Sequence, residues 1–141
     1  MLRFLITDDD DVTHVFLRHV LMGLGEVRHA FSGREALECC REALAHGAPF
    51  TCLFMDVLMP GMNGLEAIGQ IRRMYSEAGV DAPVFIMASC LSYQECLAAG
   101  AVPSALDRFI AKPFDRHTVL TALAEVGIGQ TPVRETGEGF W

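Results

Sequence analysis

Short runs of consecutive apolar residues alternate along the chain with longer segments in which apolar residues recur every three or four positions. The short runs are typical of β-strands that are buried on both faces, and the longer segments are typical of amphipathic helices. The pattern predicts strands at residues 3–7, 26–30, 50–55, 83–87 and 108–111. A helix is expected after each strand, the one after the fourth being a short helix near 92–99 in the least regular part of the chain.

Turn and capping residues mark some of the helix boundaries. Gly23 and Gly25 are expected to end the first helix, because glycine is the usual residue just past a helix C-terminus. Ser32 is suited to begin the second helix, with Glu35 three residues later completing a capping box.

Strands that alternate with helices predict an α/β fold, in which an open parallel sheet with right-handed crossovers carries helices on both faces. In such sheets ligands bind outside the carboxyl ends of the strands. Reactive side chains follow several of the predicted strands. They are Asp8 and Asp9 after the first, Asp56 after the third, Ser89 just past Ala88 after the fourth, and Lys112 after the fifth.

Clustered carboxylates without nitrogen ligands suit a hard cation such as Mg²⁺, which takes one or two carboxylates together with phosphate oxygens. Asp56 could be a ligand, a nucleophile or both, since an aspartate can attack phosphorus and form an acyl phosphate. The ammonium of Lys112 would then offset charge on the transferring phosphoryl group. A hydroxyl donor at the end of the fourth strand would complete the set of polar groups.

With these residues in view, the chain resembles the receiver domain of two-component response regulators, in particular single-domain chemotaxis regulators. The matching segments are "FLITDD", "LFMDVLMPGMNGLEAI", "PVFIMAS" and "FIAKPF", in the order in which the family carries them. The resemblance covers about residues 2–127 and implies a flavodoxin-like sheet with strand order 2-1-3-4-5. Residues 1–127 are then expected to form the receiver domain and residues 128–141 a tail without an output domain.

The resemblance also assigns roles to the residues at the strand ends. Asp56 would be the phosphoacceptor, and Lys112 would contact the phosphoryl group through a loop whose Lys112–Pro113 peptide bond is cis. Mg²⁺ would be held by Asp8, Asp9, Asp56 and the backbone carbonyl of Leu58.

Such a protein is a signalling phosphoacceptor, and the only reactions it catalyses are its own phosphorylation and dephosphorylation. The resemblance implies that the phosphoryl donor is a sensor histidine kinase or a phosphotransfer protein. The change would reach an unknown downstream protein through the surface of the fourth helix, fifth strand and fifth helix. Autodephosphorylation is expected to be slow, because Leu58 and Cys90 beside the site offer no strong hydrogen-bonding group to position water.

Several positions depart from the family pattern. Ala88 stands where a switching Ser or Thr is expected, and Ser89 follows it, so either Ser89 supplies the hydroxyl or it is an ordinary polar residue of the loop. The aromatic switch position is Phe109, which lacks a hydroxyl, and about five extra residues precede it after Gly100. Asn63 replaces the more common Asp, with little expected effect on helix capping.

Charge and composition narrow the possible partners and surroundings. The formal net charge of −7 disfavours direct binding to nucleic acid, and no apolar run is long enough for insertion into a membrane. Five cysteines without a C-x-x-C pair favour reduced thiols in a cytoplasmic protein. The five histidines are dispersed without metal-ligand spacing, which favours surface or helix-edge positions for each.

Two other interpretations are open. Asp8 and Asp10 fit the D-x-D-x-[TV] motif of haloacid-dehalogenase-like phosphatases, as nucleophile and general acid, although this leaves Asp56 and its "MPGMNG" loop unexplained. Alternatively, Ala88 could mark a receiver-fold interaction module that works without phosphorylation.

Overall fold

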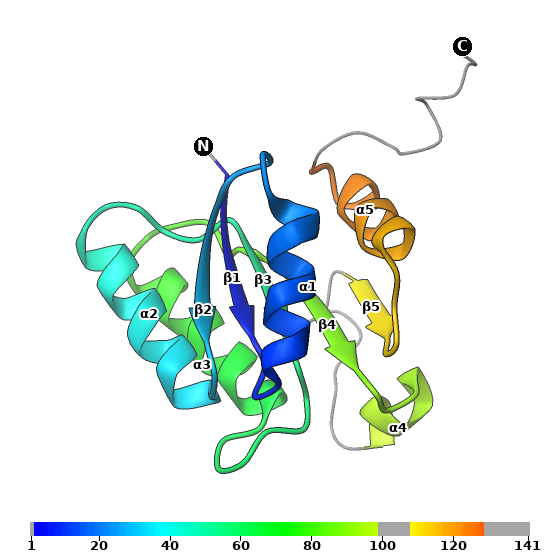
Figure 1. The fold of residues 1–141 in the computed structure, drawn as a ribbon. Helices are drawn as coiled ribbons and strands as arrows, with labels where there is room; N and C mark the ends of the chain where they lie inside the picture. Colours follow the sequence, from blue (N-terminus) through cyan, green and yellow to red (C-terminus); the bar gives the residue numbers. More distant parts are fainter. Residues whose placement is uncertain (1, 99–107, 129–141) are drawn as a thin grey trace.

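The computed structural model describes residues 2–98 and 108–128, which fold around one five-stranded parallel sheet of order β2-β1-β3-β4-β5. Figure 1 shows strands and helices alternating along the chain, as the sequence pattern predicts. Residues 100–107 of the predicted extension, and the predicted tail from residue 129 onward, lie outside the described residues. The elements are β1 Arg3–Thr7, α1 Asp11–Leu21, β2 Glu26–Ala30, α2 Gly33–Ala45, β3 Cys52–Met55, α3 Gly64–Glu77, β4 Val84–Ser89, α4 Tyr93–Ala98, β5 Arg108–Ala111 and α5 Arg116–Glu125.

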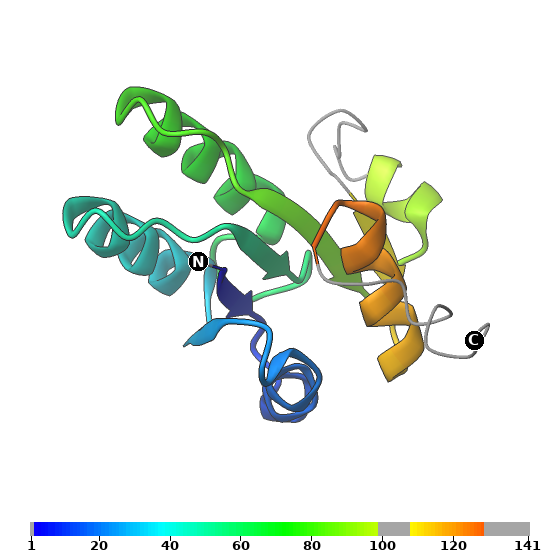
Figure 2. The ribbon, with the colours of Figure 1, turned by 90° about the horizontal axis from the view of Figure 1, so that it is seen from above.

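Helices cover both faces of the sheet (Figure 2). Each face has its own apolar core. Alternate strand residues point to opposite faces, so Leu5 packs with α2 and α3, whereas Phe4 and Ile6 pack with α1 and α5. The predicted α/β class, strand order and two-sided burial are therefore confirmed. Among the described residues, no helix is long and apolar enough to cross a membrane.

Two local predictions differ from the structure. Strand β4 extends through Ala88 and Ser89, beyond the predicted end at residue 87, because Ser89 is still paired with Ala111 of β5. At the start of α2, the Ser32 hydroxyl accepts the N–H of Glu35 as predicted, but the Glu35 carboxylate accepts the N–H of Phe31 instead of closing a capping box.

A complete capping box begins α3 instead, directly after the loop that follows β3. The Asn63 side chain accepts the N–H of Glu66 at 2.9 Å, and the Glu66 carboxylate accepts the N–H of Asn63 at 3.2 Å. Gly64, the first residue of the helix, donates its N–H to the Val57 carbonyl at 3.0 Å. These bonds set the start of α3 against the end of β3.

Gly64 is required by this close approach, because a Cβ at that position would overlap the Asp56 carbonyl oxygen and lie 2.9 Å from Cγ of Met55. Gly69 in the same helix is exposed, and a Cβ added there would meet no other atom within 4 Å. The two glycines therefore differ in whether a side chain can be accommodated.

We expect Gly64→Ala to destabilise the fold by about 1–3 kcal/mol through overpacking. Its matched control, Gly69→Ala, should stabilise the fold by about 0.5–1 kcal/mol, because alanine is the better helix former. Urea unfolding of both variants measures the two changes. Equal effects of the two substitutions would contradict the close approach of α3 to β3.

Candidate functional site

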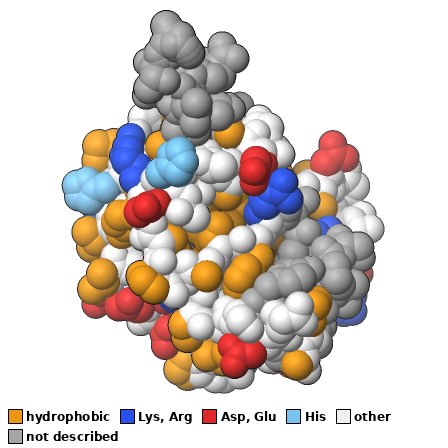
Figure 3. Space-filling view, turned by 90° about the vertical axis from the view of Figure 1, so that its right-hand side faces the viewer, with side chains coloured by type: hydrophobic (Ala, Val, Ile, Leu, Met, Phe, Trp, Pro, Cys, Tyr) orange, Lys and Arg blue, Asp and Glu red, His pale blue; other side chains and the backbone are white. Residues whose placement is uncertain are grey.

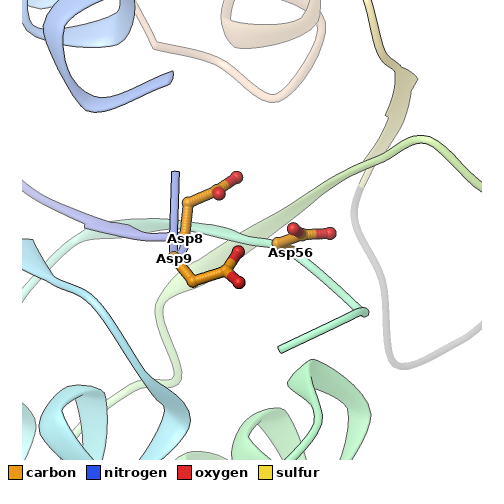
Figure 4. A group of neighbouring side chains, drawn as sticks. All are labelled: Asp8, Asp9 and Asp56. Atoms are coloured by element: carbon orange, nitrogen blue, oxygen red, sulfur yellow. The ribbon is translucent and has the colours of Figure 1, made fainter. Parts of the chain in front are cut away.

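Three carboxylates meet at the carboxyl end of the sheet. Their oxygens, one from each of Asp8, Asp9 and Asp56, all lie within 4.8 Å of one another. Figure 4 shows the first two leaving the end of β1 and the third leaving the end of β3. The register pairs Thr7 with Met55, which places Asp8 level with Asp56, and both of these side chains are buried whereas Asp9 is exposed.

Lys112, just past β5, supplies a positive charge to this cluster. Its Nζ lies 2.6 Å from Oδ2 of Asp8 and 3.3 Å from Oδ2 of Asp56. Burial alone would lower the pKa of Lys112, but its hydrogen bond to Asp8 and the charges of Asp56 and Asp8 outweigh burial and raise it. The ammonium is therefore charged at neutral pH. It contacts Asp8, which lies 104 positions before Lys112 in the sequence.

One ammonium does not balance three carboxylates. Burial raises the pKa of Asp56, and the charge of Asp8 raises it further. Lys112 and the N–H of Leu58, which lies 3.3 Å from Oδ1 of Asp56, act in the opposite direction without cancelling the rise. All of the clustered ligand atoms are oxygens, so the residues present fit a hard divalent cation such as Mg²⁺.

The end of β4 presents a methyl group, not a hydroxyl, beside Asp56. Met87 pairs with Met55 in the sheet, so Ala88 is the β4 residue level with Asp56. Because β4 continues through Ser89, the two side chains point to opposite faces. Ser89 is fully buried, and its hydroxyl accepts the N–H of Leu91 at 3.1 Å. The structure therefore does not place the Ser89 hydroxyl on the Asp56 side.

The other residues expected at the site lie around the cluster. The Lys112–Pro113 peptide bond is cis. Leu58 is half exposed, with its N–H turned toward Asp56. Phe109, at the expected switch position on β5, is half-buried against the core on the α2 and α3 face.

Asp10 and Asp11 serve the helix that follows them. Asp10 is the N-cap of α1, and its carboxylate accepts the N–H of Val12 at 3.2 Å and the hydroxyl of Thr13 at 3.3 Å. Asp11 occupies the first turn, where the helix dipole favours an acid. The carboxylate that the phosphatase interpretation needs as a general acid is thus used in capping.

The prediction that every histidine lies at the surface or at a helix edge is wrong for His14. Its side chain is 4% exposed, and its Nε2 lies 2.8 Å from the backbone carbonyl oxygen of Asp8. Sequence reasoning missed this residue because α1 places it one turn after the acidic loop, and only the folded chain shows which ring nitrogen faces the loop.

Comparison with known proteins identifies the family. The family model of the response regulator receiver domain matches residues 4–124. The chain belongs to this family. The match confirms the resemblance seen in the sequence at the level of the family. Receiver domains as a family accept phosphoryl groups from histidine kinases and bind Mg²⁺ at an acidic pocket.

Individual relatives span both stand-alone and multidomain receivers. The chain is 32% identical to the chemotaxis protein CheY of Thermotoga maritima over 126 residues, covering 88% of this chain and 96% of that protein. It is 28% identical to the osmosensing histidine protein kinase SLN1 of Saccharomyces cerevisiae, covering 87% of this chain. That match spans only 10% of the length of the kinase.

A solved structure of similar fold shows a receiver with ligands in place. The receiver domain of the histidine kinase CKI1 from Arabidopsis thaliana, complexed with Mg²⁺ and BeF₃⁻, superposes with a TM-score of 0.71 at 30% identity. The match covers 86% of this chain and 85% of that one.

Asp56→Asn is expected to raise the thermal stability of the metal-free protein at about pH 7, because it removes a buried negative charge from an unbalanced cluster. The folded chain holds the proton of Asp56 more tightly than the unfolded chain, so stability falls as pH rises through the interval between the two pKa values. The advantage of the variant should therefore shrink as pH is lowered into that interval.

Thermal unfolding in EDTA across a pH series measures this effect. Asp81→Asn, which removes the same charge from an exposed residue, is the control and should leave the midpoint unchanged. A variant at Asp56 that melts below the wild type at about pH 7 would contradict the electrostatic account.

Proposed function

We propose that this receiver accepts a phosphoryl group on Asp56 in a Mg²⁺-dependent reaction, and that it works as a stand-alone response regulator. The proposal rests on the surroundings of Asp56. Its carboxylate is buried, lies next to those of Asp8 and Asp9, and contacts the ammonium of Lys112. The match to nearly the whole length of the T. maritima CheY supports the stand-alone form.

The proposed donor is the phosphohistidine of a sensor kinase or phosphotransfer protein. A carboxylate oxygen of Asp56 attacks phosphorus, the P–N bond to the imidazole breaks, and its electron pair remains on the imidazole nitrogen. The product is an acyl phosphate on Asp56. Lys112, already 3.3 Å from Oδ2 of Asp56, offsets the charge that the phosphoryl oxygens bring into the site.

Asp8, Asp9, Asp56 and the Leu58 carbonyl would hold Mg²⁺ in this scheme. The cation would supply charge neutralisation for the phosphoryl oxygens, which the single ammonium of Lys112 does not complete. It would also counter the effect of burial and of Asp8 on the pKa of Asp56, which keeps the nucleophile ionised.

Ala88 bears on how the phosphoryl group changes the output surface of α4, β5 and α5. With a methyl group level with Asp56 and Ser89 turned to the opposite face, no β4 hydroxyl would draw the strand toward the phosphoryl oxygen. Ala88 therefore also favours a second candidate function, a receiver-fold interaction module that works without phosphorylation.

Labelling with acetyl phosphate decides between these candidates. We expect the wild type to take up about one phosphoryl group per chain only when Mg²⁺ is present, because Asp56 is the one expected nucleophile. Asp56→Asn, Asp8→Ala and Asp9→Ala should abolish the label, whereas Asp10→Ala should retain it, since Asp10 caps α1. Intact-protein mass spectrometry measures the added mass.

Each outcome has a distinct meaning. An unlabelled but folded wild type would favour the phosphorylation-independent module, and equal labelling of the wild type and Asp56→Asn would contradict the phosphoacceptor assignment. Continuous release of phosphate from a phosphomonoester would favour the phosphatase. The label should also decay slowly, because the half-exposed Leu58 and the exposed Cys90 bring no strong hydrogen-bonding group to the site.

The surface next to Lys112 fits a protein donor. A pocket of about 410 Å³ is lined largely by apolar groups of α1 and the β5–α5 loop, where the rings of Phe16 and Phe114 lie 5.8 Å apart. Val12 and Val15 on α1 are 72% and 59% exposed. Figure 3 shows apolar side chains among a few charged ones on the side of the molecule that carries β5 and α5. We propose that the donor docks over α1 beside this pocket.

The double variant Val12→Ala and Val15→Ala should slow transfer from a phosphorylated histidine phosphotransfer domain about fivefold to tenfold, because it removes apolar contact area. Labelling by acetyl phosphate should not change, since Asp56 and its neighbours are untouched. Met22→Ala, an equally exposed position at the far end of α1, is the control. Equal losses with both donors would contradict docking on α1.

A further inference from the structure

A chain of two hydrogen bonds leads from the sheet edge to the acid cluster, and the function proposed above does not use it. His14 on α1 is buried, with Nε2 2.8 Å from the Asp8 carbonyl oxygen and Nδ1 2.8 Å from Nδ1 of His29 on β2. The ring of Phe31 stacks over that of His14, with the centroids 4.0 Å apart. Both nitrogens of His14 are therefore engaged, and its ring plane is held from one side.

The partners determine which nitrogens carry protons. A carbonyl oxygen only accepts, so Nε2 of His14 must carry hydrogen and donate to Asp8. In the tautomer that carries hydrogen on Nε2 alone, Nδ1 of His14 is an acceptor, so the hydrogen between the two rings belongs to Nδ1 of His29. Burial, followed by the charges of His14 and Arg18, lowers the pKa of His29, which keeps that ring neutral at about pH 7.

The carbonyl that accepts the His14 hydrogen bond lies between two of the clustered acids. It belongs to the peptide group that joins Asp8 to Asp9, which are two of the three clustered carboxylates. Rotation of this peptide would swing both side chains relative to Asp56. On its other side the loop is held by the N–H of Asp10, which donates to Oδ1 of Asp8 at 2.9 Å.

We propose that His14 is a positioning residue for the cation site: its Nε2–H fixes the Asp8–Asp9 peptide, and His29 fixes the tautomer of His14 that can do so. The inference rests on the proposed function, in which these carboxylates hold Mg²⁺. When a residue that hydrogen-bonds to a metal ligand, without contacting the metal itself, is removed, metal affinity typically falls about 10-fold to 100-fold. A histidine that only filled the core would have no such effect on the cation.

The Mg²⁺ dissociation constant tests the proposal without relying on phosphorylation. Backbone amide NMR shifts of the acidic loop are followed during titration with MgCl₂ in the wild type and in variants that are folded by circular dichroism. We expect His14→Phe, which keeps a stacked ring but loses both bonds, to bind Mg²⁺ about tenfold more weakly. His14→Gln, whose amide can donate to the Asp8 carbonyl, should recover most of the affinity.

Two further variants complete the series. His29→Phe removes only the second bond and should weaken Mg²⁺ binding less than His14→Phe. His19→Gln, at an exposed position on the same helix, should bind Mg²⁺ as the wild type does. A folded His14→Phe variant with wild-type Mg²⁺ affinity would overturn the proposal.

The tautomers provide a measurement on the wild type alone, in case His14→Phe does not fold. Imidazole ¹⁵N shifts at about pH 8 should show hydrogen on Nε2 of His14 and on Nδ1 of His29. Hydrogen on Nδ1 of His14 in place of Nε2 would overturn the inference, since the Asp8 carbonyl would then have no donor. A wild type that binds no Mg²⁺ and takes no label would instead refute the proposed function, while equal Mg²⁺ binding by the wild type and His14→Phe refutes this inference alone.

Discussion

The unbalanced negative charge at the carboxyl end of the sheet is the constraint on which the rest of this structure depends. Among the described residues, Asp8, Asp9 and Asp56 share one small space with the ammonium of Lys112, and two of these acids are buried. Such a cluster opposes its own folding, because burial and like charges both disfavour ionised carboxylates. It persists because the strands that carry it lie between two apolar cores, which hold the backbone in place regardless of the charge.

Several groups around the cluster fix the backbone that carries the acids without adding charge to the site. Gly64 lets α3 approach the Asp56 carbonyl, and its N–H bond to Val57 closes the loop after β3. On the other side of the site, His14 donates to the carbonyl between Asp8 and Asp9. Both acid-bearing strand ends are thus held through a backbone carbonyl, that of Val57 after β3 and that of Asp8 after β1.

The strands and the members of the acid cluster could be predicted because both depend on local patterns. An apolar run of four to six residues followed by an acid predicts both a strand and the position of its carboxyl end. In a parallel sheet these carboxyl ends then lie at the same edge. The orientation of Ser89 could not be predicted in this way, since the length of β4 depends on pairing with Ala111, which is 22 positions away. The same holds for His14, whose partner on β2 is set by the packing of α1 against the sheet edge.

The placement of Ser89 changes how a phosphoryl group on Asp56 would affect the rest of the receiver. Without a β4 hydroxyl on that side, Lys112 is the group that links the cluster directly to β5: its side chain contacts Asp8 and Asp56, and its backbone N–H donates to the Ser89 carbonyl at 2.8 Å. The shorter of its two contacts is to Asp8. A cation held by Asp8 would compete for that contact, which would leave the ammonium to the acyl phosphate. Cation binding and phosphorylation would then both act on the position of Lys112, and through it on the loop that leads into α5.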